Sequence, residues 1–203
     1  MQILGPERPC DAPMPESHKL APIASFIARY GLDHFQESMQ ALYEIATRSY
    51  AAHVAVRDYI VRYPQETLQR LHQWAADEND HIRYLVSGGT CPRLRLRAMP
   101  GITKLNLFIE DPVPLLELLE RLKDDTSYRV RQSVSGNLSD IIKDNPDIAY
   151  ATLGRWQESA GKQALQVIRN ALKYSIRKGD QRAIELFESS STPVAVAGAP
   201  SAT

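Results

Sequence analysis

One pattern of residues occurs twice in this chain, 48 positions apart, and it constrains the fold more than any other feature. The pattern is a leucine, a second apolar residue, an acid and an arginine at matching intervals: Leu71, Trp74, Asp77 and Arg83, then Leu119, Leu122, Asp125 and Arg131. Leu153, Trp156 and Arg169 follow the same plan, with a longer loop expected between the helices. Each copy reads as a helix, a short turn with an acid and a second helix carrying arginine. A period of about 40–47 residues built from helix pairs is typical of HEAT-like repeats.

A single helix pair cannot bury its apolar face alone, so successive pairs stack into a solenoid. No run of alternating apolar and polar residues bounded by turns predicts a sheet. The sequence therefore predicts an all-α, right-handed HEAT-like solenoid, an α-α superhelix of three or four pairs, over residues 18–188. Prolines, glycines and apolar spacing predict helices at 22–30, 32–50, 53–63, 64–75, 77–86, 112–123, 126–143, 146–156, 162–178 and 180–187, with Gly88-Gly89 as a turn.

The two ends of the chain are expected to lack fixed structure. Residues 1–17 hold four prolines and few apolar residues, which is too little to offset the entropy of ordering. Residues 189–203 are mostly small residues and proline, typical of a flexible tail. No apolar run approaches the roughly 20 residues of a membrane span, and residues 1–13 do not resemble a secretion signal. With only Cys10 and Cys91, the chain cannot form a disulfide scaffold, so we expect a cytoplasmic protein.

Charge is balanced overall but segregated along the chain. The 24 basic and 24 acidic residues exclude a uniformly basic nucleic-acid binder. Residues 81–109, however, carry basic side chains and no acid, and residues 121–180 also hold more bases than acids, whereas residues 16–80 are acidic. In a solenoid, equivalent positions of successive repeats form a row, so the second-helix cations are expected to form a stripe. Guanidinium groups in such a stripe suit phosphate. Alternatively, these arginines are solvated or pair with acidic turn residues such as Asp77 and Asp125.

Three longer segments resemble one family. They are YPQETLQRLHQWAADENDHIRYLVSGGTCPRL, PVPLLELLERLKDDTSYRVRQSVSGNLSDIIKDNPDI and VIRNALKYSIRKGDQRAIELF. Together they cover about residues 53–187, two thirds of the chain, and they resemble the bacterial DNA alkylation repair glycosylases of the AlkC and AlkD type, more closely the AlkC branch. The resemblance implies a solenoid that holds duplex DNA in its concave face. It also implies hydrolysis of the N-glycosidic bond of cationic alkylated purines such as 3-methyladenine, without drawing the base into a pocket.

Several residues depart from this family's pattern. The acid of the family's Ser-Glu-Gly-Thr-Arg-Pro-Arg-Leu-Pro-Trp motif corresponds to Gly88, its first arginine to Cys91 and its tryptophan to Leu96. A family tryptophan and histidine correspond to Gln166 and Asn170. Glycine cannot replace a carboxylate, so these departures favour DNA contact over turnover.

Asp140 is the acid that the sequence retains for catalysis. A carboxylate beside the sugar stabilises the developing oxocarbenium charge and orients a water molecule. Asp140 alternatively bonds the following repeat, and Asn137 either binds phosphate or ties two helices together. The predicted DNA contacts are Arg83, Arg93, Arg95, Arg129, Arg131, Asn137, Arg169 and Lys173.

Other chemistry has little support. Trp74 and Trp156 are expected in the core, and Cys91 is either a thiol of lowered pKa in a basic loop or a bystander. The five histidines lack metal-ligand spacing, so we expect no metal and no cofactor. The predicted protein is a monomer that binds duplex DNA. Two alternatives remain: a degenerate member that binds DNA without cleaving the glycosidic bond, and a helical-repeat scaffold that holds a protein partner.

Overall fold

The computed structural model describes residues 19–94 and 103–190, and these residues form eleven α-helices. The bounds are α1 Ala21–Tyr30, α2 Phe35–Ala46, α3 Ala52–Arg62, α4 Pro64–Trp74, α5 Asp80–Gly89, α6 Asn106–Glu110, α7 Val113–Leu122, α8 Tyr128–Asp144, α9 Pro146–Glu158, α10 Lys162–Arg177 and α11 Gln181–Ser189. Within these two ranges β pairing is limited to one isolated bridge, between Arg93 and Lys104. The predicted all-α fold is confirmed.

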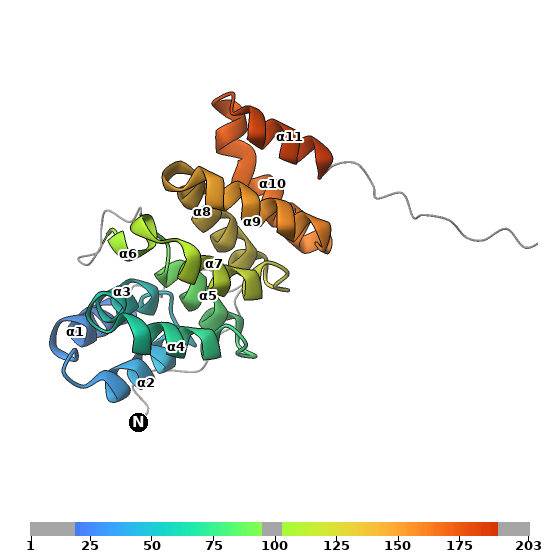
Figure 1. Cartoon of the computed structure of the whole chain (residues 1–203). Coiled ribbons are helices and arrows are strands. Elements are labelled where there is room, and N and C mark those ends of the chain that lie inside the picture. The colour runs from blue at the N-terminus through green and yellow to red at the C-terminus, as the bar shows by residue number, and fades with distance from the viewer. Residues whose placement is uncertain (1–18, 95–102, 191–203) are drawn as a thin grey trace, which may run out of the picture.

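The helices are arranged as stacked pairs (Figure 1). α4 pairs with α5, α7 with α8, and α9 with α10, in chain order from the lower part of the view to α11 at the top. The second helices pack on one another in the series α3, α5, α8 and α10 and form one layer. The first helices form the other layer, in which α4 contacts α7 and α9 contacts α11. This is the two-layer order that the repeat predicts.

Local signals in the sequence set most of the helix ends. Pro64 and Pro146 occupy the first positions of α4 and α9, where the missing N–H costs nothing. Asn79 accepts a hydrogen bond from the His81 N–H at 2.9 Å and so caps α5. Gly179 has a φ of 79°, a left-handed conformation that favours glycine, and it ends α10 as expected.

Apolar side chains between the two layers form one continuous core. Trp156 is fully buried and Trp74 is 6% exposed, as the sequence predicted. Leu122 fills the corresponding position of the middle pair and is also fully buried. The three side chains follow the sequence repeat because the same helix end faces the core in each pair.

The prediction of a turn at Gly88-Gly89 was wrong, because α5 continues through both glycines. Glycine is required at the second position because α3 lies very close to α5. A Cβ atom on Gly89 would lie 2.5 Å from Cγ1 of Val56 and 3.2 Å from the His53 carbonyl oxygen. The two glycines therefore permit close helix packing rather than chain reversal. The short helix α6 was not predicted.

The third repeat also differs from its prediction. We expected a longer loop between its helices, but α9 ends at Glu158 and α10 begins at Lys162, which is a shorter connection than in the first two pairs. Counted from the helix start, Leu165 and not Arg169 takes the position of Arg83 and Arg131. The arginine register is therefore shared by two repeats and not by three.

The calls on the chain ends and on Arg95 fall in residues 1–18, 95–102 and 191–203, outside the described residues. None of the helices within 19–94 and 103–190 combines the length and apolar character needed to cross a bilayer.

Candidate nucleic-acid interface

A groove with a volume of about 770 Å³ lies between α8 and α10, and we call it the α8–α10 groove. Its charged lining consists of one acid and four cations: Asp140, Arg93, Lys143, Lys173 and Arg177. Tyr128 and Tyr174 add aromatic surface, and both are well exposed, at 60% and 42%. The groove therefore combines a carboxylate, a surplus of positive charge and two exposed rings.

Asp140 is held in place by a neighbour one helical turn away. Its side chain is 4% exposed, and its Oδ1 accepts a hydrogen bond from Nζ of Lys143 at 2.9 Å. Positions three apart lie on the same face of a helix, so the α8 backbone alone brings the pair together. The carboxylate is thus positioned at the groove wall rather than free in solvent.

Tyr174 of α10 faces the amine of Lys143. The Nζ atom lies 5.0 Å from the ring centroid, and Nζ of Lys178 lies 5.8 Å from it. Both distances are within cation–π range. The ring and the Asp140 carboxylate therefore contact the same ammonium group, which links α8 to α10 across the groove.

Arg93 reaches the groove from the segment after α5. It forms a two-point ion pair with Asp144 near the end of α8, with Nη2 2.8 Å from Oδ1. Hydrogen bonding to Asp144 raises the pKa of Arg93. About 35% of the Arg93 side chain remains exposed, so the group is fixed in orientation and still accessible from the groove.

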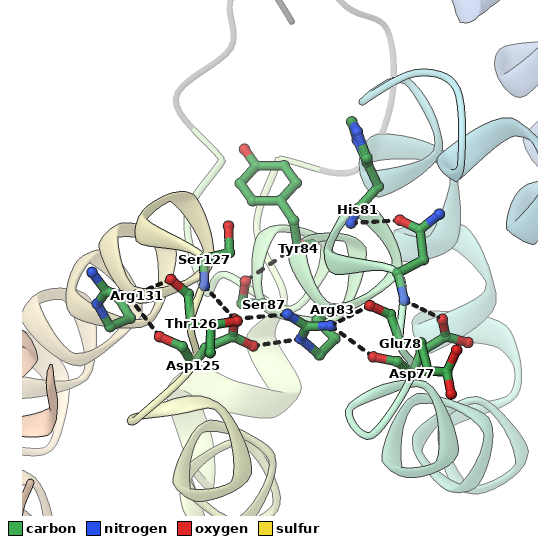
Figure 2. Close-up of polar contacts among 11 residues, drawn as sticks. Asp77, Glu78, His81, Arg83, Tyr84, Ser87, Asp125, Thr126, Ser127 and Arg131 are labelled. Carbon is green, nitrogen blue, oxygen red and sulfur yellow. Dashed lines mark hydrogen bonds and ion pairs between the residues drawn. The ribbon is translucent and has the colours of Figure 1, made fainter. Parts of the chain in front are cut away.

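The arginines of the inter-helix turns have a different environment (Figure 2). Arg83 donates from Nε and Nη2 to the Asp125 carboxylate, at 2.6 and 3.0 Å. Its Nη1 donates to the carbonyl oxygens of Asp77 and Glu78, at 2.7 and 2.9 Å. The pKa of Arg83 is raised, first by the hydrogen bond to Asp125. With 14% of its side chain exposed, Arg83 joins two repeats, which is the ion-pair alternative that the sequence left open.

Arg131 repeats half of this arrangement. Its Nη1 donates to the carbonyl oxygens of Asp125 and Thr126, as Arg83 does to Asp77 and Glu78. Ser159 occupies the position where the next turn would supply an acid. Nε of Arg131 is buried and has no hydrogen-bond partner among the described residues. The same turn geometry therefore occurs with and without its carboxylate.

The remaining predicted contacts do not line the α8–α10 groove. Arg169 donates to the carbonyl and hydroxyl oxygens of Ser190, after α11. Asn137 is 1% exposed, and its Nδ2 donates to the Ser87 carbonyl oxygen at 2.7 Å, so it ties α8 to α5. Arg129 stacks over the Tyr50 ring at 5.3 Å and lines a separate cavity of about 530 Å³ that also contains Glu78 and Asp80. Of the predicted set, Asp140, Arg93 and Lys173 therefore lie together.

The position of the missing family acid is packed with aromatic side chains. A Cβ atom on Gly88 would lie 3.3 Å from Cε1 of Tyr84 and 3.7 Å from Cβ of His53. The Tyr84 ring is 4.9 Å from the Tyr50 ring and 5.9 Å from the His53 ring. Burial lowers the pKa of His53, so this cluster favours the neutral imidazole. Neutral rings rather than a carboxylate surround Gly88.

Cys91 follows α5 and contacts a buried cation. Nη1 of Arg57, which is fully buried, donates to the carbonyl oxygens of Gly89 and Cys91 and lies 3.4 Å from the Cys91 Sγ. These bonds fix the segment that leads to Arg93. Within residues 19–94 and 103–190, no group of three His, Cys, Asp or Glu side chains is placed to hold a metal ion.

Two cations of the groove, Lys143 and Arg177, were missed by the sequence analysis. A signal for them was present, because Lys143 follows Asp140 by three residues and Arg177 follows Lys173 by four. Such spacings place side chains on one helix face. The analysis compared equivalent positions between repeats and did not follow each helix face from its candidate residue.

Comparison with known proteins gives one curated relative and one solved structure. YhaZ of Bacillus subtilis, an uncharacterized protein, is 33% identical over 162 residues, which are 80% of this chain and 43% of YhaZ. The structure of Pseudomonas fluorescens alkylpurine DNA glycosylase AlkC bound to DNA containing an abasic site analog matches with a TM-score of 0.73 and 30% identity. The match covers 87% of this chain and 51% of AlkC. This chain thus spans about half the length of these relatives, and no family model matches it.

The structural match extends over nearly all the described helices, at an identity above that of folds that agree by chance of architecture. The resemblance to the AlkC-type alkylpurine DNA glycosylases that the sequence indicated is therefore confirmed, in fold and in sequence.

Proposed function

We propose that this chain binds duplex DNA along the α8–α10 groove and hydrolyses the N-glycosidic bond of cationic N-alkylated purines such as 3-methyladenine. The observation that carries the proposal is the placement of one fixed carboxylate, Asp140, among four cations in an open groove. The cations suit the phosphates on either side of a lesion, and the carboxylate suits the sugar. The AlkC structure, solved with DNA, supports the same class of partner.

The chemistry demands little beyond these groups. A purine alkylated on a ring nitrogen is already positively charged and leaves without prior protonation. The sugar then develops oxocarbenium character, which a fixed anion stabilises. Asp140 supplies that anion and accepts a hydrogen bond from the attacking water, while the exposed ring of Tyr174 supplies a face for the cationic base.

Release of 3-methyladenine from methylated duplex DNA tests this proposal, with Asp140→Asn compared to wild type. We expect wild-type release and a loss of about a hundredfold or more in the variant, the scale on which removal of a charge-stabilising group acts. Asp147→Asn is the matched control, because Asp147 is an exposed acid of α9 whose side chain is 90% exposed and lies outside the groove. Equal activity of wild type and Asp140→Asn would contradict the assigned role.

A second function, DNA binding without excision, is favoured by Gly88 and its aromatic surroundings. In that case no base is released, and duplex binding persists. Neutralisation of phosphates makes affinity fall steeply with salt, with a slope of about −0.9 per phosphate in the logarithmic plot. Absence of duplex binding even at low salt would contradict both functions and favour the protein scaffold.

A further inference from the structure

Lys143 is the primary amine of the groove that lies beside an acid. Its Nζ atom is 2.9 Å from Oδ1 of Asp140, and 32% of its side chain is exposed to the groove. Lys173 lines the same groove but forms no ion pair with an acid among the described residues. The two lysines therefore differ in chemistry although they share one surface.

An amine with an adjacent carboxylate has the two groups that attack on a carbonyl requires. The ammonium form is not nucleophilic, so a base must take a proton as the amine approaches carbon. Asp140 is at hydrogen-bond distance for that transfer. Arg93, Lys173 and Arg177 lie around the pair and suit the phosphates on either side of a reacting nucleotide.

Excision of a base leaves an abasic sugar, and its ring-opened form presents an aldehyde. We infer that Lys143 forms an imine with the aldehyde of abasic sites bound in the α8–α10 groove, which gives this chain an abasic-site lyase activity. The inference rests on the proposed DNA binding to this groove. It adds a second substrate, the abasic site, and a second reaction, cleavage of the strand.

The steps conserve atoms and electrons without any redox partner. The neutral amine adds to C1′, and the carbinolamine loses water to give a protonated imine. A base, for which Asp140 is placed, removes a proton from C2′, and the C3′–O bond breaks with the phosphate as leaving group. Hydrolysis of the imine then releases the unsaturated aldehyde on one strand fragment and restores the lysine.

Reductive trapping tests the inference directly. Full-length protein is incubated with a duplex that carries one abasic site, in the presence of sodium cyanoborohydride, which reduces an imine to a stable amine. We expect a covalent protein–DNA adduct that peptide mapping places on Lys143. The variant Lys143→Arg keeps the positive charge beside Asp140 but cannot form the imine, so its adduct should be lost while duplex binding is retained.

Lys173→Arg is the matched control, and it should form the adduct at Lys143 as wild type does. An adduct on another lysine, or no adduct from protein that binds the duplex, would overturn the inference. Binding and 3-methyladenine release are measured on the same preparations. Failure of duplex binding contradicts the proposed function, whereas binding without an adduct contradicts the lyase alone.

Discussion

The cations of the inter-helix turns and those of the α8–α10 groove share helix α8 but bind different partners. Arg83 and Arg131 donate to main-chain carbonyl oxygens of the preceding turn, and Arg83 also binds Asp125 (Figure 2). Lys173 and Arg177, in the groove, line open space. The first set holds repeats together, and the second set is available to a ligand.

The difference follows from where each cation lies along its helix. Side chains on a helix point toward its N-terminus. Arg83 and Arg131 are the fourth residues of α5 and α8, so they reach back to the turn carbonyls. Lys143, Lys173 and Arg177 lie in the C-terminal halves of α8 and α10, where the neighbouring groups belong to the facing helix. Equivalence in the repeat therefore predicts structural use, not availability to phosphate.

The largest expected effect is on the turn that has its carboxylate. Asp125→Asn leaves the mostly buried Arg83 guanidinium without its counter-charge, so we expect a loss of about 3 kcal/mol in the free energy of unfolding. Urea unfolding measures it. Asp147→Asn is the control, because Asp147 pairs with Arg182 at the exposed surface and its loss is expected to cost below about 0.5 kcal/mol. Equal losses would show that the Arg83 pair contributes no more than a surface pair.

The groove set should affect DNA binding and leave stability unchanged. The double change Lys173→Gln and Arg177→Gln is expected to weaken duplex affinity about tenfold, since each exposed ion pair contributes up to about 1 kcal/mol. The salt slope should fall by about two. Titration at several salt concentrations measures both. An unchanged slope would mean that DNA lies elsewhere on the molecule.

Arg131 should contribute less than Arg83. Arg131→Met removes two hydrogen bonds to carbonyl oxygens but breaks no ion pair with an acid, so we expect a loss of about 1 kcal/mol in unfolding free energy. Arg83→Met, measured in the same way, should cost more, because it also leaves Asp125 without its guanidinium. If the two variants are equally destabilised, the carbonyl contacts dominate both turns.

The smallest expected effect is a gain. Ser159→Asp restores an acid at the turn after α9, where Arg131 has a buried Nε without a hydrogen-bond partner in the described part of the chain. We expect a stabilisation of about 0.5 kcal/mol by urea unfolding, on the scale of a partly exposed ion pair. Ser159→Asn, which has the shape without the charge, is the control. No gain would indicate that the shorter third connection places residue 159 away from Arg131.

Much of the fold was predictable from the sequence because its signals are local. Pro64 and Pro146 begin helices, Gly179 ends one, and the Trp74 and Trp156 positions recur in the core. α6 was missed because its five residues are too few for a periodic pattern. The Gly88-Gly89 turn was predicted wrongly because close packing between helices, which glycine also serves, leaves no mark in the local sequence.

The sequence by itself determined the helices, their pairing and the presence of an acid and many arginines on the second helices. Only the tertiary structure decided which cations are free for a ligand. That choice depends on contacts between residues far apart in the chain, such as Arg83 with Asp125 and Arg93 with Asp144. A carboxylate neutralises a guanidinium only when packing brings the two within a few ångströms, and packing is a property of the whole solenoid.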